Sequence, residues 1–294
     1  PGKCFRQEAT PFCCKPSTIA ATICAGGLLT GADTVDYPES FPQYDFDAQL
    51  AHRQIYWGCG RADPTAEVEM GPNIADWPSF SALPEHLLLV VSGVYGGSVT
   101  TDELVPSGEA SAYRSNPEKL AAFTLQNRDA GYYGRAKAIR DFSDRYREED
   151  GAEAESTLAA CCAALEKRLR CSHAAIEVGS VILCDRVGDG SAREQAASSQ
   201  RVLGGRANIA VEYVTKRYCS NLINWGMLPL LTDMPLVLEP GEYLLLRGIR
   251  TAITAGDSRI EAERVNEQGE VLEVYKLRCP PLSEDERQLL LAGC

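Results

Sequence analysis

The sequence predicts an α/β fold, and the pattern of residues 174–214 supports this prediction. An apolar strand pattern at residues 174–184 passes through a glycine-rich turn into a helical pattern at 192–203, and a second strand pattern follows at 207–214. Strand, turn, helix and strand in this order build a unit of parallel strands joined by a helix. The 294 residues, 45% of them hydrophobic, are enough for about two domains.

The N-terminal part of the chain predicts one helix and a long irregular connection. Residues 16–26 have a helical pattern, with Ser17 as a favourable N-cap and a glycine pair as the stop. Residues 33–80 show no sustained period, so we expect a linker draped over a surface. The prolines that interrupt it are Pro38, Pro42, Pro64, Pro72 and Pro78.

The middle of the chain alternates between strand and helix patterns. Residues 86–94 predict an apolar strand that ends in a turn at 95–98. Asn116 is a favourable cap for a helix that begins at the proline after it. The charged residues at 145–155 predict an exposed loop that leads into a helix ending near Arg170.

The C-terminal part predicts a further helix, a region of strands and a last helix. Residues 216–225 have a helical pattern that Gly226 stops, and residues 241–280 predict short strands and turns. Ser283 and Glu286 have the spacing of a capping box, which predicts a final helix.

The charge balance excludes two classes of partner. The chain has 41 acidic and 29 basic residues, a formal net charge of −12. Such a protein has no general affinity for phosphate backbones or anionic membranes, so we expect neither a nucleic acid nor a membrane as partner. An anion site, if present, requires a local cluster of arginines.

The twelve cysteines predict free thiols in a reducing compartment, and therefore a cytoplasmic protein. No pair has the C-x-x-C spacing, and the three histidines form no cluster with cysteines, so we expect no metal site within this chain. Cys161 and Cys162 lie at helical spacing with leucines, which favours core packing. The apolar stretch at 18–29 is too short to span a membrane.

The turn at Gly190-Ser191-Ala192-Arg193 places a hydroxyl and a guanidinium at the start of a predicted helix. Free backbone N–H groups there favour an anion, and they can stabilise a hydroxyl that loses its proton. The turn has neither the P-loop nor the dinucleotide-binding pattern. The alternative is structural, with Ser191 as a helix cap and Arg193 as a surface charge.

A second candidate group is Thr100-Thr101-Asp102, with Arg114 twelve residues further on. The alternative is again structural, because an aspartate after a strand commonly forms a turn and a lone arginine commonly lies on the surface. No G-x-S-x-G pattern is present, so a hydrolase nucleophile is not predicted.

Together these motifs resemble the C-terminal swivel domain of the aconitase superfamily. Its members carry G-S-S-R-E-H/Q-A-A, then L-G-G-R-A, then S/T-N-L…G-x-L-P-L, and upstream T-T-D-H followed by a substrate arginine. Thr100-Thr101-Asp102 resembles T-T-D-H, and Arg114 falls at the position of that arginine. The other matching residues are Gly188–Ala197 (GDGSAREQAA), Leu203–Ala207 (LGGRA), Ser220–Leu222, Gly226 and Leu228–Leu230.

The resemblance implies an organisation for the whole chain. Residues 1–35 would be the C-terminal stub of a cluster-bearing α/β/α domain, 36–80 a long irregular linker, and 81–294 a swivelling β/β/α domain. The family's cluster cysteines lie further upstream. The chain would then be a fragment of a long single-chain hydratase, and its partners would be the missing N-terminal cluster domains of the same protein.

The resemblance also implies a chemistry, the dehydration and rehydration of a hydroxy di- or tricarboxylic acid by a hydro-lyase. A [4Fe–4S] cluster in the full-length parent would act as Lewis acid, with ligands outside this chain. Ser191 would be the general base, and Ala192 and Arg193 would stabilise its alkoxide. Arg193 and Arg114 would bind substrate carboxylates, and Asp102 would orient the substrate or relay protons. The fragment alone would be inactive.

Two positions depart from the family pattern: Ala192 replaces the second serine of G-S-S-R, and Glu103 replaces the histidine of T-T-D-H. These departures leave a catalytically inactive paralogue as an alternative. A further alternative is a small swivel subunit that pairs with a separate cluster-bearing subunit. An RNA-binding relative of aconitase is disfavoured by the net charge of −12.

Overall fold

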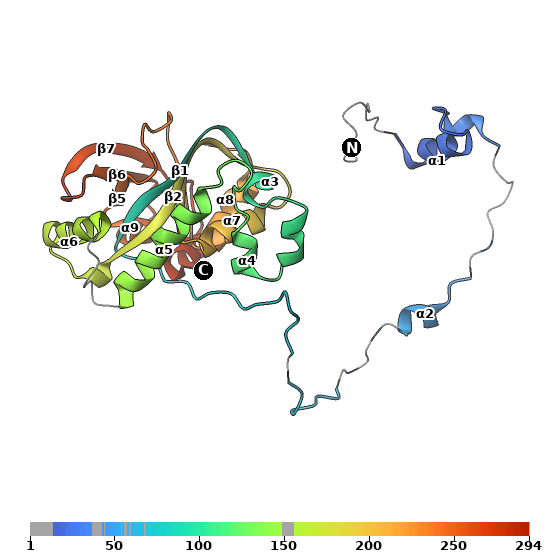
Figure 1. Cartoon of the computed structure of the whole chain (residues 1–294), viewed down its shortest axis with the longest axis horizontal. Coiled ribbons are helices and arrows are strands. Elements are labelled where there is room, and N and C mark those ends of the chain that lie inside the picture. The colour runs from blue at the N-terminus through green and yellow to red at the C-terminus, as the bar shows by residue number, and fades with distance from the viewer. Residues whose placement is uncertain are drawn as a thin grey trace. The chain divides into compact units, whose positions relative to one another are not determined.

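The structure is a computed structural model, and its described residues fall into two units, one within residues 1–67 and one within 68–294 (Figure 1). The described residues are 14–36, 43, 45–53, 55, 58, 60–67, 69–148 and 156–293. Within them, no helix is both long enough and apolar enough to cross a membrane.

The first unit contains the predicted N-terminal helix. It runs as α1 (Pro16–Cys24), and a 3-10 turn (Ala32–Thr34) and the short helix α2 (Ala48–His52) follow. The expected cap at Ser17 is wrong, because Pro16 occupies the first helical position and Lys15 is the N-cap residue. Proline is well suited there, since its fixed φ matches the helix and its missing N–H would have no partner.

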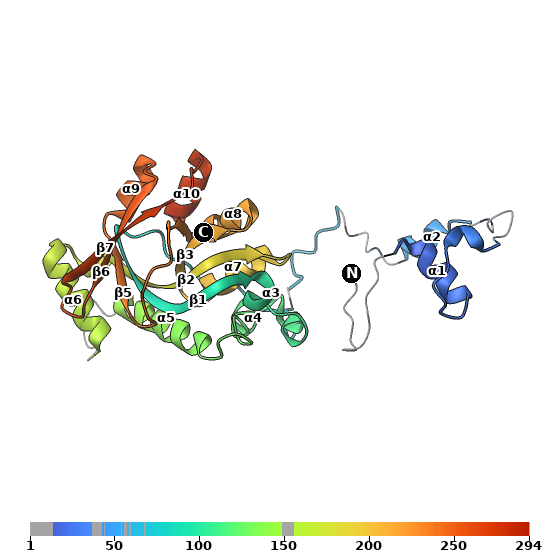
Figure 2. The same cartoon turned by 90° about the horizontal axis from the view of Figure 1, so that it is seen from above.

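The second unit is built on a closed barrel, which contains seven strands of the described residues. β1, β2, β3 and β4 pair in this order as parallel neighbours, and β7, β6 and β5 close the barrel as antiparallel strands (Figure 2). The strands are β1 (His86–Thr100), β2 (Ile176–Asp189), β3 (Gly205–Tyr213), β4 (Leu228–Leu231), β5 (Tyr243–Leu246), β6 (Arg259–Val265) and β7 (Val271–Arg278).

Helices connect the strands and cover the barrel. α7 (Arg193–Val202) joins β2 to β3 and α8 (Lys216–Asn224) joins β3 to β4, as parallel neighbours require. The second unit also contains α3 (Thr101–Leu104), α4 (Pro117–Ala121), α5 (Tyr132–Glu148), α6 (Thr157–Leu169), α9 (Ile249–Ala255) and α10 (Glu284–Ala292), with 3-10 turns at Glu109–Tyr113 and His173–Ala175.

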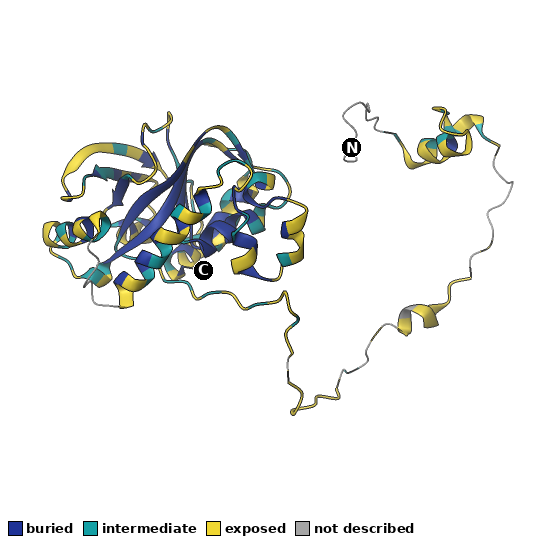
Figure 3. Cartoon of the chain, viewed as in Figure 1, coloured by how far each residue is buried: buried dark blue, intermediate teal, exposed yellow. Residues whose placement is uncertain are grey.

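The core explains why β1 and β2 are apolar on both faces. Leu87 and Leu89 of β1 belong to a cluster that draws residues from all seven strands, whereas Leu88 and Val90 pack in a cluster with residues of α5 and α6. Strands covered on both faces have continuous apolar sequences rather than alternating ones. Figure 3 shows both strands buried along most of their length.

Cys161 and Cys162 are fully buried and pack with Phe142 in the cluster that contains Leu88 and Val90. Their expected role in core packing is therefore confirmed.

The structure corrects two expected turns. Residues 95–98 do not end the first strand; β1 continues to Thr100, with register shifts at this point. Gly97 has a positive φ there, and its N–H donates to the Asp185 carboxylate at 2.6 Å. The expected turn after residue 184 begins later as well, because β2 stays paired with β1 as far as Asp189.

Helical segments also occur where the sequence predicted none, and two of them change the expected boundaries most. The first charged residues of 145–155 extend α5 to Glu148, where Arg147 pairs with Asp144 at 2.8 Å. The rest of that stretch, 149–155, lies outside the described residues. Ile249–Ala255 forms α9 within a region where strands and turns were expected.

Candidate functional site

Parallel pairing brings the two predicted motifs to one edge of the barrel. Thr100, the last residue of β1, is in register with Asp189, the last residue of β2. α3 begins directly after Thr100, and the turn that leads into α7 begins directly after Asp189. Two motifs about ninety residues apart in the sequence therefore meet at the carboxyl ends of neighbouring strands, where α/β proteins commonly bind ligands.

Gly190 fits the two motifs against each other. Its φ is +124°, and a Cβ atom at this position would lie 2.0 Å from the Thr101 hydroxyl oxygen and 3.5 Å from the Thr101 backbone nitrogen. Only glycine combines this backbone conformation with this close approach. The glycine before Ser191 thus fixes the distance between the start of α3 and the turn before α7.

Ser191 is exposed, and no hydrogen bond joins its side chain to any described residue. The alternative that Ser191 caps the helix is wrong: the N-cap residue is Ala192, and no side chain of the described residues caps α7. The first N–H groups of this helix are therefore available to an anion, which the helix dipole also favours.

Arg193, the first residue of α7, lies at this edge. Its side chain is half-buried, its Nε is buried without a hydrogen-bond partner, and no described carboxylate lies within ion-pair distance. The neighbouring Glu194 does not neutralise it, because its carboxylate accepts a hydrogen bond from the Trp225 indole N–H at 2.8 Å. A guanidinium without a carboxylate is suited to bind an anionic ligand in bidentate geometry.

Arg114 reaches the same helix start from a distant part of the chain. It follows the 3-10 turn at Glu109–Tyr113, and its Nη1 donates a hydrogen bond to Oε1 of Gln195 in the first turn of α7. The structure thus brings Arg114 and Arg193 to one helix terminus. Sequence reasoning did not single out Gln195, whose one signal was its place in the Gly188–Ala197 motif.

Asp102 lies in the first turn of α3, one residue after the Thr101 that contacts Gly190. It is exposed, and no hydrogen bond links it to Ser191. Ser191 and Arg114 are exposed as well, so the candidate site is an open edge. A cavity of about 210 Å³ lies at the other end of the strands, and none of the site residues is among its described lining residues.

Glu103, at the histidine position of the family motif, has a structural role here. Its carboxylate accepts hydrogen bonds from the Thr100 N–H at 2.7 Å and forms an ion pair with Arg128 at 3.0 Å. Burial alone would raise the pKa of Glu103, but the hydrogen bonds from Thr100 and the charge of Arg128 outweigh it and hold the pKa below its ordinary value. Glu103 is thus an anion that locks α3 onto β1.

The described residues do not fit an iron–sulfur cluster. Among them no three His, Cys, Asp or Glu side chains gather as a metal site would require. The described cysteines are free thiols. Burial raises the pKa of Cys162 and of Cys184 to about 12, so both remain protonated and unreactive.

An uncapped helix start with two arginines beside it has the chemistry to bind a small anion. Residues 174–234 match the family model of the aconitase C-terminal domain. The resemblance to this domain that the sequence suggested is thereby confirmed for residues 174–234. The α/β fold class is confirmed by the parallel strands and connecting helices of the second unit. The matched segment contains Ser191, Ala192 and Arg193, whereas Asp102 and Arg114 lie outside it.

Over the whole chain, the similarity to known proteins is weaker. No curated protein matches it. Among solved structures, 3-isopropylmalate dehydratase from Methanocaldococcus jannaschii is similar, with a TM-score of 0.40 and 18% sequence identity, over 71% of this chain and 89% of that chain.

Proposed function

We propose that this chain provides the substrate-binding and proton-abstracting surface of a hydro-lyase that acts on a hydroxy di- or tricarboxylic acid. One observation carries the proposal: the unpaired Arg193 lies at an uncapped helix start, within a segment that matches the aconitase C-terminal domain. Arg114, held at the same helix by Gln195, supplies a second cation. Two guanidinium groups suit a substrate with two or more carboxylates.

Substrate binding depends on these local cations because the protein as a whole repels anions. With a net charge of −12, the average field opposes a polyanion, although salt screens it beyond about 8–10 Å. Within that range the attraction for an anion comes from Arg193, Arg114 and the free N–H groups of α7, which act against the carboxylates of Asp189 and Glu194 beside them in the sequence. We propose that one carboxylate lies on Arg193 and the helix start, and another on Arg114.

Ser191 is the proposed base. Its alkoxide would take the proton from the carbon next to a carboxylate, a C=C bond would form, and the hydroxyl of the neighbouring carbon would leave with its bonding electrons. The backbone N–H groups after Ser191, of Ala192 and Arg193, would stabilise the alkoxide. Asp102, in the first turn of α3, is the proposed proton relay or orienting group at this edge.

The proposal requires a partner. Because the described residues hold no ligand set for a cluster, we place the [4Fe–4S] cluster on a partner domain or subunit, and derive no step of this chain's chemistry through it. The expected division into a stub at 1–35, a linker at 36–80 and a swivel domain at 81–294 is part of the same proposal. Free thiols favour a cytoplasmic location.

The decisive experiment titrates the chain with citrate, a hydroxy tricarboxylate, by isothermal calorimetry. We expect Arg193→Gln to weaken binding at least about tenfold, because a charge-assisted hydrogen bond contributes roughly 1.5–3 kcal/mol. Arg186→Gln is the matched control, since Arg186 is exposed at the end of β2 but paired with Glu212 at 2.9 Å. Equal effects of the two variants, or unchanged binding by Arg193→Gln, would contradict the proposal.

The second candidate is a paralogue that binds the carboxylic acid but does not turn it over. Ala192 and the structural role of Glu103 favour it, because the hydroxyl and the imidazole of the family pattern are both missing. Mixing the chain with a cluster-bearing partner distinguishes the active hydro-lyase from the inactive paralogue. Citrate binding that depends on Arg193, without turnover, identifies the paralogue.

A further inference from the structure

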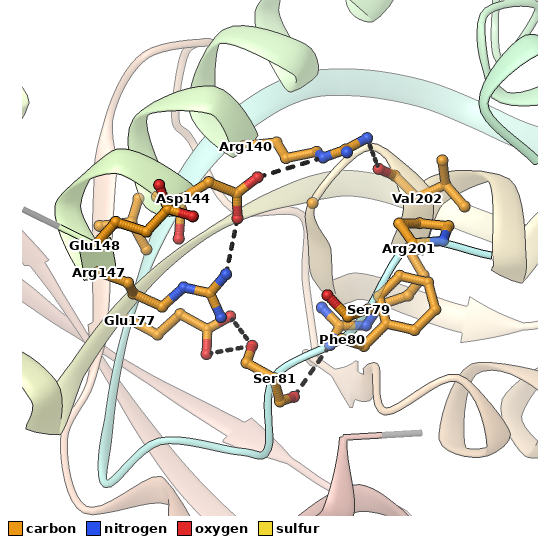
Figure 4. A pocket seen from close by; sticks show the side chains of 14 residues that line it. Ser79, Phe80, Ser81, Arg140, Asp144, Arg147, Glu148, Glu177, Arg201 and Val202 are labelled. Carbon is orange, nitrogen blue, oxygen red and sulfur yellow. Dashed lines mark hydrogen bonds and ion pairs between the residues drawn. The ribbon is translucent and has the colours of Figure 1, made fainter. Parts of the chain in front are cut away.

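A second hollow lies at the opposite end of the parallel strands from the candidate site. It has a volume of about 210 Å³, and it lies between the C-terminal half of α5, the start of β2, the end of α7 and residues 78–81 (Figure 4). Figure 4 shows Asp144, Arg147, Glu148 and Glu177 together on one side of this hollow and Phe80 and Arg201 on the other. The proposed dehydration does not use this hollow.

Two of the lining arginines are committed to the fold. Arg140 pairs with Glu118 at 2.7 Å and donates to the Val202 carbonyl at 2.8 Å. Arg201 lies over the Phe80 ring, 4.7 Å from its centroid, and donates to the Ser81 carbonyl at 3.2 Å. These contacts shape the walls, so a ligand has to be recognised by other groups.

Three lining oxygen groups have acceptor capacity left. The Ser143 side chain is only 7% exposed and has no hydrogen bond with any described residue. Glu177, also 7% exposed, accepts hydrogen bonds from the Ser81 hydroxyl at 2.8–2.9 Å and forms an ion pair with Arg206, whose Nε lies 3.4 Å from its Oε1. Glu148 is exposed and has no partner among the described residues. A carboxylate has about four acceptor positions, so this wall can accept further N–H donors.

Arg147 provides the complementary group. Among the described residues Arg147 is engaged only through Nη2, with Asp144 at 2.8 Å, although a guanidinium carries five N–H donors. The lining side chains balance in charge, with Arg140, Arg147 and Arg201 against Asp144, Glu148 and Glu177. A hollow with spare acceptors beside a spare guanidinium and no net charge favours a zwitterion over a polyanion.

We propose that this hollow binds a free α-amino acid. Its ammonium group would donate to Glu177, Glu148 and the Ser143 hydroxyl, and its carboxylate would accept from Arg147. The volume is below that of sites for drug-sized ligands, which fits a molecule of this size. Because residues 78–81 form one wall, the bound amino acid would tie this segment to α5.

The test is calorimetric titration of the full chain with each of the common L-amino acids up to about 10 mM. We expect at least one to bind, and its decarboxylated amine and its deaminated acid to bind at least about tenfold more weakly. Arg147→Gln and Glu148→Gln should each weaken binding by a similar factor. Arg145→Gln is the matched control, because Arg145 is on α5 but outside the hollow and should leave binding unchanged.

The competing outcomes are distinct. If no amino acid binds, or if binding survives both Arg147→Gln and Glu148→Gln, the inference is wrong. Citrate should not displace the amino acid, and displacement would overturn the assignment to a separate site. Arg193→Gln should not affect amino-acid binding. The amino-acid titration therefore tests this inference alone, whereas the citrate titration tests the proposed function alone.

Discussion

Arg193 differs from Arg128 and Arg206 of the same unit in having no carboxylate partner among the described residues. Arg128 is paired with Glu103, and the buried Arg206 contacts Glu177. A half-buried guanidinium without a carboxylate is unfavourable unless an anion completes it. This difference depends on which side chains surround Arg193 in the folded protein. Composition and spacing therefore could not decide whether Arg193 binds a ligand or is a surface charge.

Ser191 allows a direct test of the proposed chemistry. In the chain combined with the proposed cluster-bearing partner, Ser191→Ala should lower the turnover rate by roughly 10²–10⁴-fold or more, because a positioned base contributes about that factor. Substrate affinity should stay nearly unchanged, since the carboxylates are bound by arginines. Steady-state kinetics and calorimetry measure the two effects.

The control for this prediction is Ser172→Ala, which removes an exposed hydroxyl that caps no helix by its side chain. Normal turnover in the Ser191→Ala variant would show that another group is the base.

At the scale of elements, local pattern predicted most of the α/β unit and nonlocal packing decided the rest. The helix at 192–203 and the capping box at Ser283 are confirmed, because both depend on neighbouring residues. α9 was missed because Ile249 and Ile253 are β-branched and favour strands. Both are buried with the barrel residues at helical spacing, and this packing overrides their propensity.

The candidate site shows the same division. Its motifs are local, so Ser191, Arg193 and Asp102 could be chosen from the sequence. The contact of Arg114 with Gln195 spans 81 positions, and the closeness of Gly190 to Thr101 depends on the pairing of β1 with β2. No sequence period contains such information.

The junction of β1 and α3 predicts a pH dependence of stability. Glu103 has a pKa below its ordinary value of about 4.5. A carboxyl with a lowered folded-state pKa stabilises the fold above its unfolded pKa, and this contribution disappears as the pH falls through the folded value. Glu103→Gln should therefore destabilise the protein at neutral pH and make little difference in acid.

Urea unfolding at about pH 7 and about pH 3.5 measures this effect. Glu109→Gln is the control, because Glu109 is exposed and starts a 3-10 turn without an ion pair in the described structure. An equal loss of stability by Glu103→Gln at both pH values would mean that its charge is not what stabilises the junction.

At the scale of the second unit, buried arginines join the segment before β1 to the C-terminal end. Arg206 donates to the Ser81 carbonyl at 3.3 Å and to the Ala82 carbonyl at 3.2 Å. Arg201 donates to the Gly293 carbonyl at 3.3 Å, and the Leu83 N–H donates to the Leu291 carbonyl at 3.2 Å. These contacts join residues 81–83 to residues 291–293, outside the strand pairing that closes the barrel.

Arg206 also forms a buried ion pair, since its side chain is 1% exposed and that of its partner Glu177 is 9% exposed. Arg206→Met should lower the free energy of unfolding by about 3–5 kcal/mol, because it leaves Glu177 charged and buried. Removing both charges by Arg206→Met and Glu177→Met should destabilise the protein less than the sum of the single variants. Denaturant unfolding measures all three.

The exposed pair of Arg186 and Glu212, with side chains 51% and 55% exposed, is the matched control. Arg186→Met should change the free energy of unfolding by less than about 1 kcal/mol, because water screens that pair. If Arg206→Met were equally mild, the buried pair of Arg206 and Glu177 would contribute no more to stability than the exposed pair.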